Sequence, residues 1–151
     1  MDRRKSVTKH HLVTDAEGIP LAVRLTSSNR HDVTQLIPLI DAIPPIAGKV
    51  GHPMQRPKEI FADRAYDSGP HREQLTQRGI EAVIAERNTE HGSGLGIFRW
   101  VVERTMSWLH QFRRLRVRYE RRADIHMAFL KIGSIVICYR YLTSSFCQAL
   151  L

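Results

Sequence analysis

The stretch Glu59-Ile-Phe-Ala-Asp-Arg-Ala-Tyr-Asp-Ser-Gly-Pro-His-Arg-Glu-Gln-Leu-Thr-Gln-Arg-Gly-Ile-Glu-Ala-Val-Ile-Ala85 decides the fold class. Residues 59–62 form a short, mainly apolar run that predicts a buried strand. A helix is expected over residues 69–78, because Gly79 follows it as a C-cap. A second strand is expected over residues 80–85. A strand, a helix and a strand in this order indicate an α/β protein.

The elements outside this stretch are a β-hairpin, one helix before it, two helices after it, and two loops rich in glycine or proline. Their expected bounds are 9–14 and 19–26 for the hairpin strands, 31–43, 97–112 and 123–142 for the helices, and 47–57 and 88–96 for the loops. The predicted order is therefore β-β-α-β-α-β-α-α. No internal repeat interrupts it.

The composition predicts a basic protein of one domain. The 151 residues are long enough for one core, so residues 1–151 are taken as one unit, with strands and helices over about 8–85 and closing helices over about 97–146. A net charge of +8 favours a polyanionic partner, nucleic acid before a membrane, and a merely basic solvated surface is the alternative. With a polar N-terminus and no secretory signal, a cytoplasmic location is expected.

The most apolar part of the chain spans residues 125–142. Lys131 and Arg140 interrupt it, so it predicts a core helix rather than a membrane span. Cys138 and Cys147 are too few for a disulfide framework and are expected to be small buried apolar residues in a reducing compartment.

Two acidic residues lie where the pattern predicts chemistry. Asp63 follows the strand 59–62, at the sheet edge where ligands and catalytic groups gather in α/β proteins, and a turn aspartate held by backbone amides is the alternative. Glu103 lies among apolar residues of the helix 97–112, so it is expected to reach solvent along a cleft or to be paired. Arg99, one turn earlier, is a possible partner, and an ordinary surface pair is the alternative.

Residues 113–122, called the arginine segment below, predict a nucleic-acid surface. The planar guanidinium suits phosphate, and only Glu120 offers local neutralisation. Phe112 and Tyr119 are interleaved with the arginines and are candidates for stacking on bases or sugars, whereas Trp100 and Trp108 are expected to be packing anchors. A solvated face is the alternative. The arginines are Arg113, Arg114, Arg116, Arg118, Arg121 and Arg122.

Several of these motifs together resemble the catalytic region of bacterial insertion-sequence transposases of the DDE type, in the branch with a Tyr-Arg-Glu-Lys signature. The resemblance covers nearly the whole chain. It rests on Lys9-His-His-Leu-Val-Thr-Asp15 with Gly18-Ile-Pro-Leu21, on Asn29-Arg-His-Asp32, on Ala62-Asp-Arg-Ala-Tyr-Asp67, on Arg99-x-x-x-Glu103 and on the arginine segment. The family implies a ribonuclease-H-like fold, and the predicted order matches that fold without its first, central strand.

The resemblance also implies roles for individual residues. Asp63 matches the second catalytic aspartate and Glu103 the catalytic glutamate, and both would hold Mg²⁺ or Mn²⁺. Arg99 matches the signature arginine and would orient Glu103 or stabilise phosphate charge. His110 falls where the signature has lysine and would contact DNA, while Gly96 falls where it has tyrosine. The first aspartate of the family lies on the strand that precedes the segment matching Lys9.

The implied activity is metal-dependent cleavage of transposon ends and strand transfer to target DNA, with double-stranded DNA as partner. Because the first aspartate is not matched, the chain is expected to be a truncated or frameshift-split fragment, inactive alone. It would then act with an N-terminal transposase half or a full-length transposase, and without a membrane. The alternative is a non-catalytic DNA-binding fragment that modulates a full-length transposase. A ribonuclease-H-like nuclease acting on RNA–DNA hybrids is a further alternative.

Overall fold

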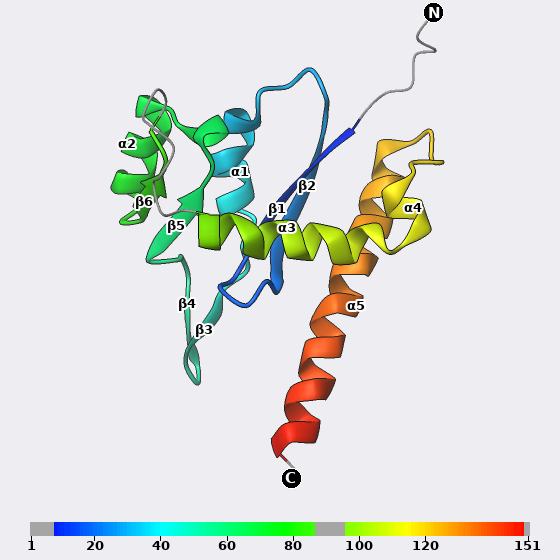
Figure 1. The fold of residues 1–151 in the computed structure, drawn as a ribbon. Coiled ribbons are helices and arrows are strands. Elements are labelled where there is room, and N and C mark those ends of the chain that lie inside the picture. The colour runs from blue at the N-terminus through cyan, green and yellow to red at the C-terminus, as the bar shows by residue number, and fades with distance from the viewer. Residues whose placement is uncertain (1–7, 87–95, 150–151) are drawn as a thin grey trace, which may run out of the picture.

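The computed structural model describes residues 8–86 and 96–149 (Figure 1). Its first element is an antiparallel hairpin of β1 (Thr8–Thr14) and β2 (Pro20–Ser27), as predicted. The Asp15 carboxylate closes the turn by accepting the backbone N–H groups of Glu17 at 2.9 Å and Ile19 at 2.8 Å. The hairpin therefore follows from local turn chemistry.

The predicted strand–helix–strand unit is also present. β5 (Glu59–Ala62) and β6 (Glu81–Ile84) pair in parallel, and α2 (Gly69–Gln77) connects them. Gly79 ends the helix region in the left-handed conformation that a C-cap requires, with φ of 70°. A core cluster lies between this unit and the helix before it, and consists of Leu36, Ile37, Ile40, Ile60, Leu75, Ile80 and Ile84.

The helix expected over residues 31–43 is shorter than predicted. A 3-10 turn, η1 (Asp32–Gln35), leads into α1 (Leu36–Ile40). Pro38 is the third residue of α1, where a missing backbone N–H costs no intrahelical hydrogen bond. Pro38 is therefore compatible with a helix that starts at Leu36.

The prediction of a loop over residues 47–57 is wrong for residues 47–54. β3 (Ile46–Lys49) and β4 (His52–Met54) form a small antiparallel hairpin that projects from the body (Figure 1). Gly48 has φ of 86°, and a Cβ there would lie 2.7 Å from the carbonyl oxygen of His52, so only glycine fits the paired strand. The other predicted loop falls mostly on residues 88–95, which lie outside the described residues, and Gly96 already belongs to the next helix.

Three helices close the chain. α3 (Gly96–His110) runs across the β1–β2 hairpin, the short α4 (Arg113–Arg116) follows it, and α5 (Ala123–Ala149) leads away to the C-terminus (Figure 1). α4 was not predicted. A second core cluster joins these helices to the hairpin around Leu109, Leu115, Leu130 and Ile137.

The strands form three separate two-stranded sheets: β1–β2, β3–β4 and β5–β6. Within the described residues, the second edge of β1 and that of β5 pair with no strand. A side-chain contact joins β1 to the turn that follows β5, because His11 Nδ1 lies 3.4 Å from the hydroxyl of Tyr66. The mixed α/β class is confirmed. The ribonuclease-H-like arrangement with its central strand missing stays a prediction.

α5 is a core helix along one face only. Leu130, Ser134 and Ile137 are buried, whereas Ile132, Ile135, Tyr139 and Leu142 are exposed. By length and composition residues 123–144 of this helix are apolar enough to cross a membrane, with 28% of that window buried. One such helix is weak evidence for a membrane span, because core helices of soluble proteins pass the same test. Cys138 on this helix is half-buried rather than fully buried.

Candidate functional site

Asp63 lies at the carboxyl end of β5, at the edge predicted from the sequence. It is exposed, and its Oδ1 accepts the backbone N–H of Arg64 at 2.6 Å, which caps the 3-10 turn η2 (Arg64–Tyr66). The carboxylate therefore has the structural role of a turn aspartate and remains open to solvent at its other oxygen. A turn aspartate held by a backbone amide and a carboxylate available at a ligand-binding sheet edge are therefore compatible interpretations of Asp63.

Glu103 is exposed and paired, and pairing with Arg99 is one of the arrangements that the sequence predicted. Its side chain is 59% exposed and accepts Arg99 Nε at 2.7 Å, one turn earlier on α3. The buried face of α3 instead carries Thr105 and Leu109. The surface pair weighed as the alternative is thus the observed arrangement.

Asp63 and Glu103 both interact with the same guanidinium. The pKa of Arg99 is raised by its hydrogen bond to Glu103, by the charge of Glu103 and by the charge of Asp63. Asp63 directly follows β5, and Glu103 lies on α3. Glu103 forms a direct hydrogen bond with Arg99, whereas the charge of Asp63 acts on Arg99 only as a weaker electrostatic influence.

An aromatic stack aligns these two elements. Phe61 of β5 and Phe98 of α3 lie face to face, with ring centroids 3.8 Å apart and planes inclined by 11°. Phe61 is two residues from Asp63, and Phe98 precedes Arg99 directly. The stack therefore sets the distance between the end of β5 and the start of the helix that carries Glu103.

Tyr66 is a neighbour of the site that sequence reasoning missed. Burial, followed by the charges of Asp32 and Asp63, raises its pKa to about 12. The phenol therefore stays protonated at neutral pH. Tyr66 could have been noticed from the sequence, because it lies inside the Ala62–Asp67 block that resembles the family. Asp32 is itself paired with Lys9 at 2.8 Å.

The predicted DNA-binding arginines fall into two groups. The first group stabilises the protein itself. Arg114 donates to Glu120 at 2.7 Å, and Arg122 pairs with Asp124. Arg118 donates to three oxygens, namely the carbonyls of Glu120 at 2.8 Å and Arg121 at 3.0 Å and the hydroxyl of Thr8 at 3.1 Å.

The second group faces solvent. Arg113, Arg116 and Arg121 are exposed, and none of them forms an ion pair with the part of the chain that the structure describes. Arg113 lies over the ring of Tyr119, 5.7 Å from its centroid, and donates to its hydroxyl at 3.3 Å. The exposed Tyr119 is thereby held beside a cation, as a stacking platform would be.

His110, at the end of α3, is exposed, and its ring centroid lies 6.2 Å from that of His10. Its predicted contact with DNA stays a prediction. Trp100 is more exposed than a packing anchor would be. Arg104 lies between the two tryptophan rings, 4.4 Å from the centroid of Trp100 and 5.0 Å from that of Trp108.

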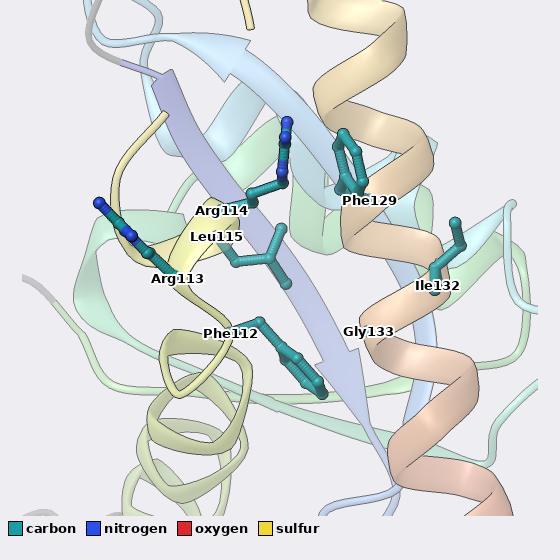
Figure 2. Close-up of a pocket in the computed structure, with 7 residues that line it drawn as sticks. All are labelled: Phe112, Arg113, Arg114, Leu115, Phe129, Ile132 and Gly133. Carbon is teal, nitrogen blue, oxygen red and sulfur yellow. The ribbon is translucent and has the colours of Figure 1, made fainter. Parts of the chain in front are cut away.

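A shallow groove of about 250 Å³ lies between α4 and α5 (Figure 2). Phe112, Leu115, Phe129 and Ile132 give it an apolar lining. Figure 2 shows Arg113 directed away from α5 and Arg114 alongside Phe129, whose ring centroid lies 5.0 Å from the guanidinium carbon of Arg114. Arg113 and Arg114 are the charged residues of the lining, and none of the lining residues that the structure describes is an acid or a nucleophile.

The carboxylates present fit part of a divalent-ion site. Carboxylate oxygens are the ligands that Mg²⁺ and Mn²⁺ prefer, and both Asp63 and Glu103 are exposed. Within residues 8–86 and 96–149, however, no group of three or more His, Cys, Asp or Glu side chains is placed to hold a metal ion. The assignment of Asp63 and Glu103 as metal ligands therefore stays a prediction of the family resemblance.

Comparison with known proteins agrees with these observations. A family model described as "Transposase DDE domain" matches residues 2–94, and a second model of the same description matches residues 60–140. A protein of Burkholderia cepacia named "Putative transposase for insertion sequence element IS402" is 66% identical over 141 residues, which cover 93% of this chain and 67% of that protein. No solved structure matches. The chain belongs to the DDE transposase family.

Proposed function

We propose that this chain binds double-stranded DNA, both transposon ends and target, through Arg113, Arg116 and Arg121 and contributes Asp63 and Glu103 to metal-dependent cleavage and strand transfer. The observation that supports the proposal is the Phe61–Phe98 stack, which joins the strand before Asp63 to the helix on which Arg99 hydrogen-bonds Glu103. DNA transposition is the activity of the family, and bacterial DNA lies in the cytoplasm, so we place the protein there.

Asp63 and Glu103 would hold Mg²⁺ or Mn²⁺, which when bound activates a water or 3′-hydroxyl and stabilises the leaving oxygen. The protein's own contribution is positioning. Arg99 holds Glu103 through a hydrogen bond of 2.7 Å and offers its charge to the scissile phosphate. The backbone N–H of Arg64 fixes one oxygen of Asp63, so the carboxylate orientation is set before metal or DNA arrives.

The third carboxylate would come from outside the described residues. The unpaired second edges of β1 and β5 support this part of the proposal, because a strand lying between them would join the two sheets. An N-terminal transposase segment or a full-length transposase is the proposed source. On this basis the chain binds DNA alone and cleaves it only with that partner.

A second candidate is a non-catalytic DNA-binding protein that modulates a full-length transposase. The exposure of Glu103 favours it, since the described residues leave the carboxylate open to solvent. Both candidate functions use the arginine surface, but only the catalytic one requires the carboxylates of Asp63 and Glu103 for cleavage. The variants Asp63→Asn and Glu103→Gln therefore distinguish the two functions.

DNA binding is tested by fluorescence anisotropy with a labelled duplex over a range of salt concentrations. Affinity should fall steeply with salt, and the triple variant Arg113→Ala, Arg116→Ala, Arg121→Ala should flatten the slope by up to about 3 because up to three phosphate contacts are lost. The control triple variant Lys49→Ala, Lys58→Ala, Lys131→Ala removes the same charge from exposed residues elsewhere. Equal losses in both triples would contradict a specific role for the arginine segment.

Cleavage is tested by nicking of supercoiled plasmid in Mg²⁺, with the chain alone and with a full-length transposase of the family whose residues matching Asp63 and Glu103 are changed to amides, so that it supplies only the first aspartate. Cleavage that needs both proteins, and that Asp63→Asn or Glu103→Gln lowers, supports the catalytic proposal. Strong nicking by the chain alone that Asp63→Asn abolishes would overturn the need for a third acid from elsewhere. Acid variants that leave every activity unchanged would favour the modulator.

A further inference from the structure

Glu120 is a buried acid inside the arginine segment. Its side chain is only 6% exposed, although its neighbours in sequence are exposed or half-buried. Oε1 accepts Arg114 at 2.7 Å, Oε2 lies 3.3 Å from His126 Nδ1, and the backbone carbonyl accepts Arg118 Nε at 2.8 Å. Glu120 thus ties Arg114 and Arg118 to the start of α5.

The contacts continue into the β-hairpin. His126 is 1% exposed, and its Nε2 lies 3.0 Å from Nε2 of His10 on β1. A carboxylate only accepts, so Nδ1 of His126 carries the hydrogen that faces Glu120. The Nε2 atoms of His126 and His10 then share one hydrogen across the 3.0 Å contact. The resulting chain of hydrogen bonds runs from His10 through His126 to Glu120, which also accepts Arg114.

This network differs from an ordinary surface pair. The Arg122–Asp124 pair lies on the same segment, but its side chains are 72% and 63% exposed, so solvent screens it. Burial alone would raise the pKa of Glu120, yet hydrogen bonds from Arg114, the backbone and His126 outweigh it and lower that pKa. The carboxylate is therefore ionised and fixed at neutral pH.

We propose that Glu120 is a positioning residue that fixes the arginine segment in its DNA-binding conformation, with His126 and His10 holding Glu120 in place. Arg114 and Arg118 are the internal supports, and Arg113, Arg116 and Arg121 are presented to the DNA backbone. The inference rests on the proposed DNA-binding function of the segment. It adds that a negative charge in the centre of a DNA-binding surface strengthens binding.

The Glu120→Gln variant tests this proposal because two physical effects have opposite signs. Removing a negative charge beside DNA should by itself tighten binding. Loss of a pre-ordered arrangement should weaken it by about tenfold, since long side chains must then be ordered during binding. The control variant Asp124→Asn makes the same charge change at the exposed pair and should tighten binding severalfold.

A second pair of variants keeps the test valid if Glu120→Gln fails to fold, as judged by circular dichroism. In His126→Asn the amide nitrogen replaces Nδ1 as donor to Glu120, whereas His126→Leu has no donor. Binding near wild type for His126→Asn and weakened for His126→Leu supports the proposal. Equal binding by these two folded variants, or tighter binding by Glu120→Gln, overturns it.

The alanine triple variant of Arg113, Arg116 and Arg121 distinguishes failure of the positioning role of Glu120 from failure of the proposed DNA-binding function. If that triple variant binds duplex DNA as the wild type does, the segment is not the DNA surface and both proposals fall. If the triple variant binds weakly while Glu120→Gln binds tightly, the DNA surface stands and only the positioning role of Glu120 is wrong.

Discussion

Phe61 and Phe98 stack at 3.8 Å between ring centroids, and this contact places the strand that ends at Asp63 beside the helix that carries Glu103. Phe61 is half-buried, and 41% of Phe98 is exposed, so burial explains only part of its position. Stacked aromatic pairs contribute about 0.5–1.5 kcal/mol beyond the area they bury. The pair is therefore a means of alignment as well as of stability.

Phe98→Ala should weaken the joint binding of a divalent ion by Asp63 and Glu103. The expected loss of stability is about 1 kcal/mol, because one stacked ring is lost from a partly exposed site. Mn²⁺-induced broadening of the backbone NMR signals of residues 63 and 103 measures the ion binding. Phe98→Tyr keeps the stack and should behave as wild type. Identical broadening in Phe98→Ala would show that the stack does not position the acids.

Thr105 ties α3 to the turn of the β1–β2 hairpin. Its buried hydroxyl donates to the carbonyl of Gly18 at 2.7 Å. Gly18 has φ of 88°, and a Cβ there would lie 2.8 Å from Thr105 Oγ1. Gly18→Ala should therefore destabilise the protein by about 2–4 kcal/mol, through backbone strain and steric conflict together.

The control for Gly18→Ala is Gly51→Ala. Gly51 has φ of 78°, and a Cβ there would meet no described atom within 4 Å, so only strain of about 1–2 kcal/mol applies. Urea unfolding measures both variants. Equal losses would mean that the contact with Thr105 relaxes without cost.

Stability should fall as the pH is lowered through the titration of His10. Burial, followed by the charges of His126, His110 and His11, lowers the pKa of His10 from 6.5 to about 4. Between these values the unfolded chain binds more protons than the folded one, so the free energy of unfolding increases with pH. Burial also lowers the pKa of His11, which acts in the same direction. Because His10 is partly solvated, we expect a loss of about 1–2 kcal/mol.

Urea unfolding at about pH 7 and about pH 5 measures this dependence in the wild type and in His10→Asn, where it should be smaller. His52→Asn, at an exposed position on β4, should leave the pH dependence unchanged. A dependence of equal size in His10→Asn would assign it to other groups.

Gly133 marks the close approach of α5 to α4. A Cβ at this buried position would lie 2.8 Å from Leu115 Cδ1 and 3.2 Å from Leu109 Cδ2. Gly133→Ala should destabilise the protein by about 1–3 kcal/mol through overpacking and should weaken DNA binding by displacing the arginine segment. Gly69→Ala, where a Cβ would meet no described atom within 4 Å, is the control and should be neutral. Thermal unfolding and anisotropy measure the two effects, and unchanged values in Gly133→Ala would contradict the packing argument.

The elements that the sequence predicted well are those with local causes. The turn at Asp15 and the C-cap at Gly79 depend on backbone geometry within a few residues, and both are observed. The β3–β4 hairpin was missed because its glycines and prolines resemble a loop, and only the pairing of residues 46–54 makes them strands. The pairing of Glu103 with Arg99 was also predictable, because an (i, i+4) pair depends only on helical spacing, whereas the buried face of α3 is centred on Thr105 and Leu109.

The sequence by itself determined the β1–β2 hairpin, the strand–helix–strand unit, the two long closing helices and the basic charge, because turn residues, hydrophobic period and charge are local properties. Only the tertiary structure brought β5 beside α3 through the Phe61–Phe98 stack, since these residues lie on different elements far apart in the chain. It also divided the arginine segment into supports and exposed cations. The contacts of Glu120 with Arg114, Arg118 and His126, and of His126 with His10, join residues 114–126 to residue 10 and have no periodic signal in the sequence.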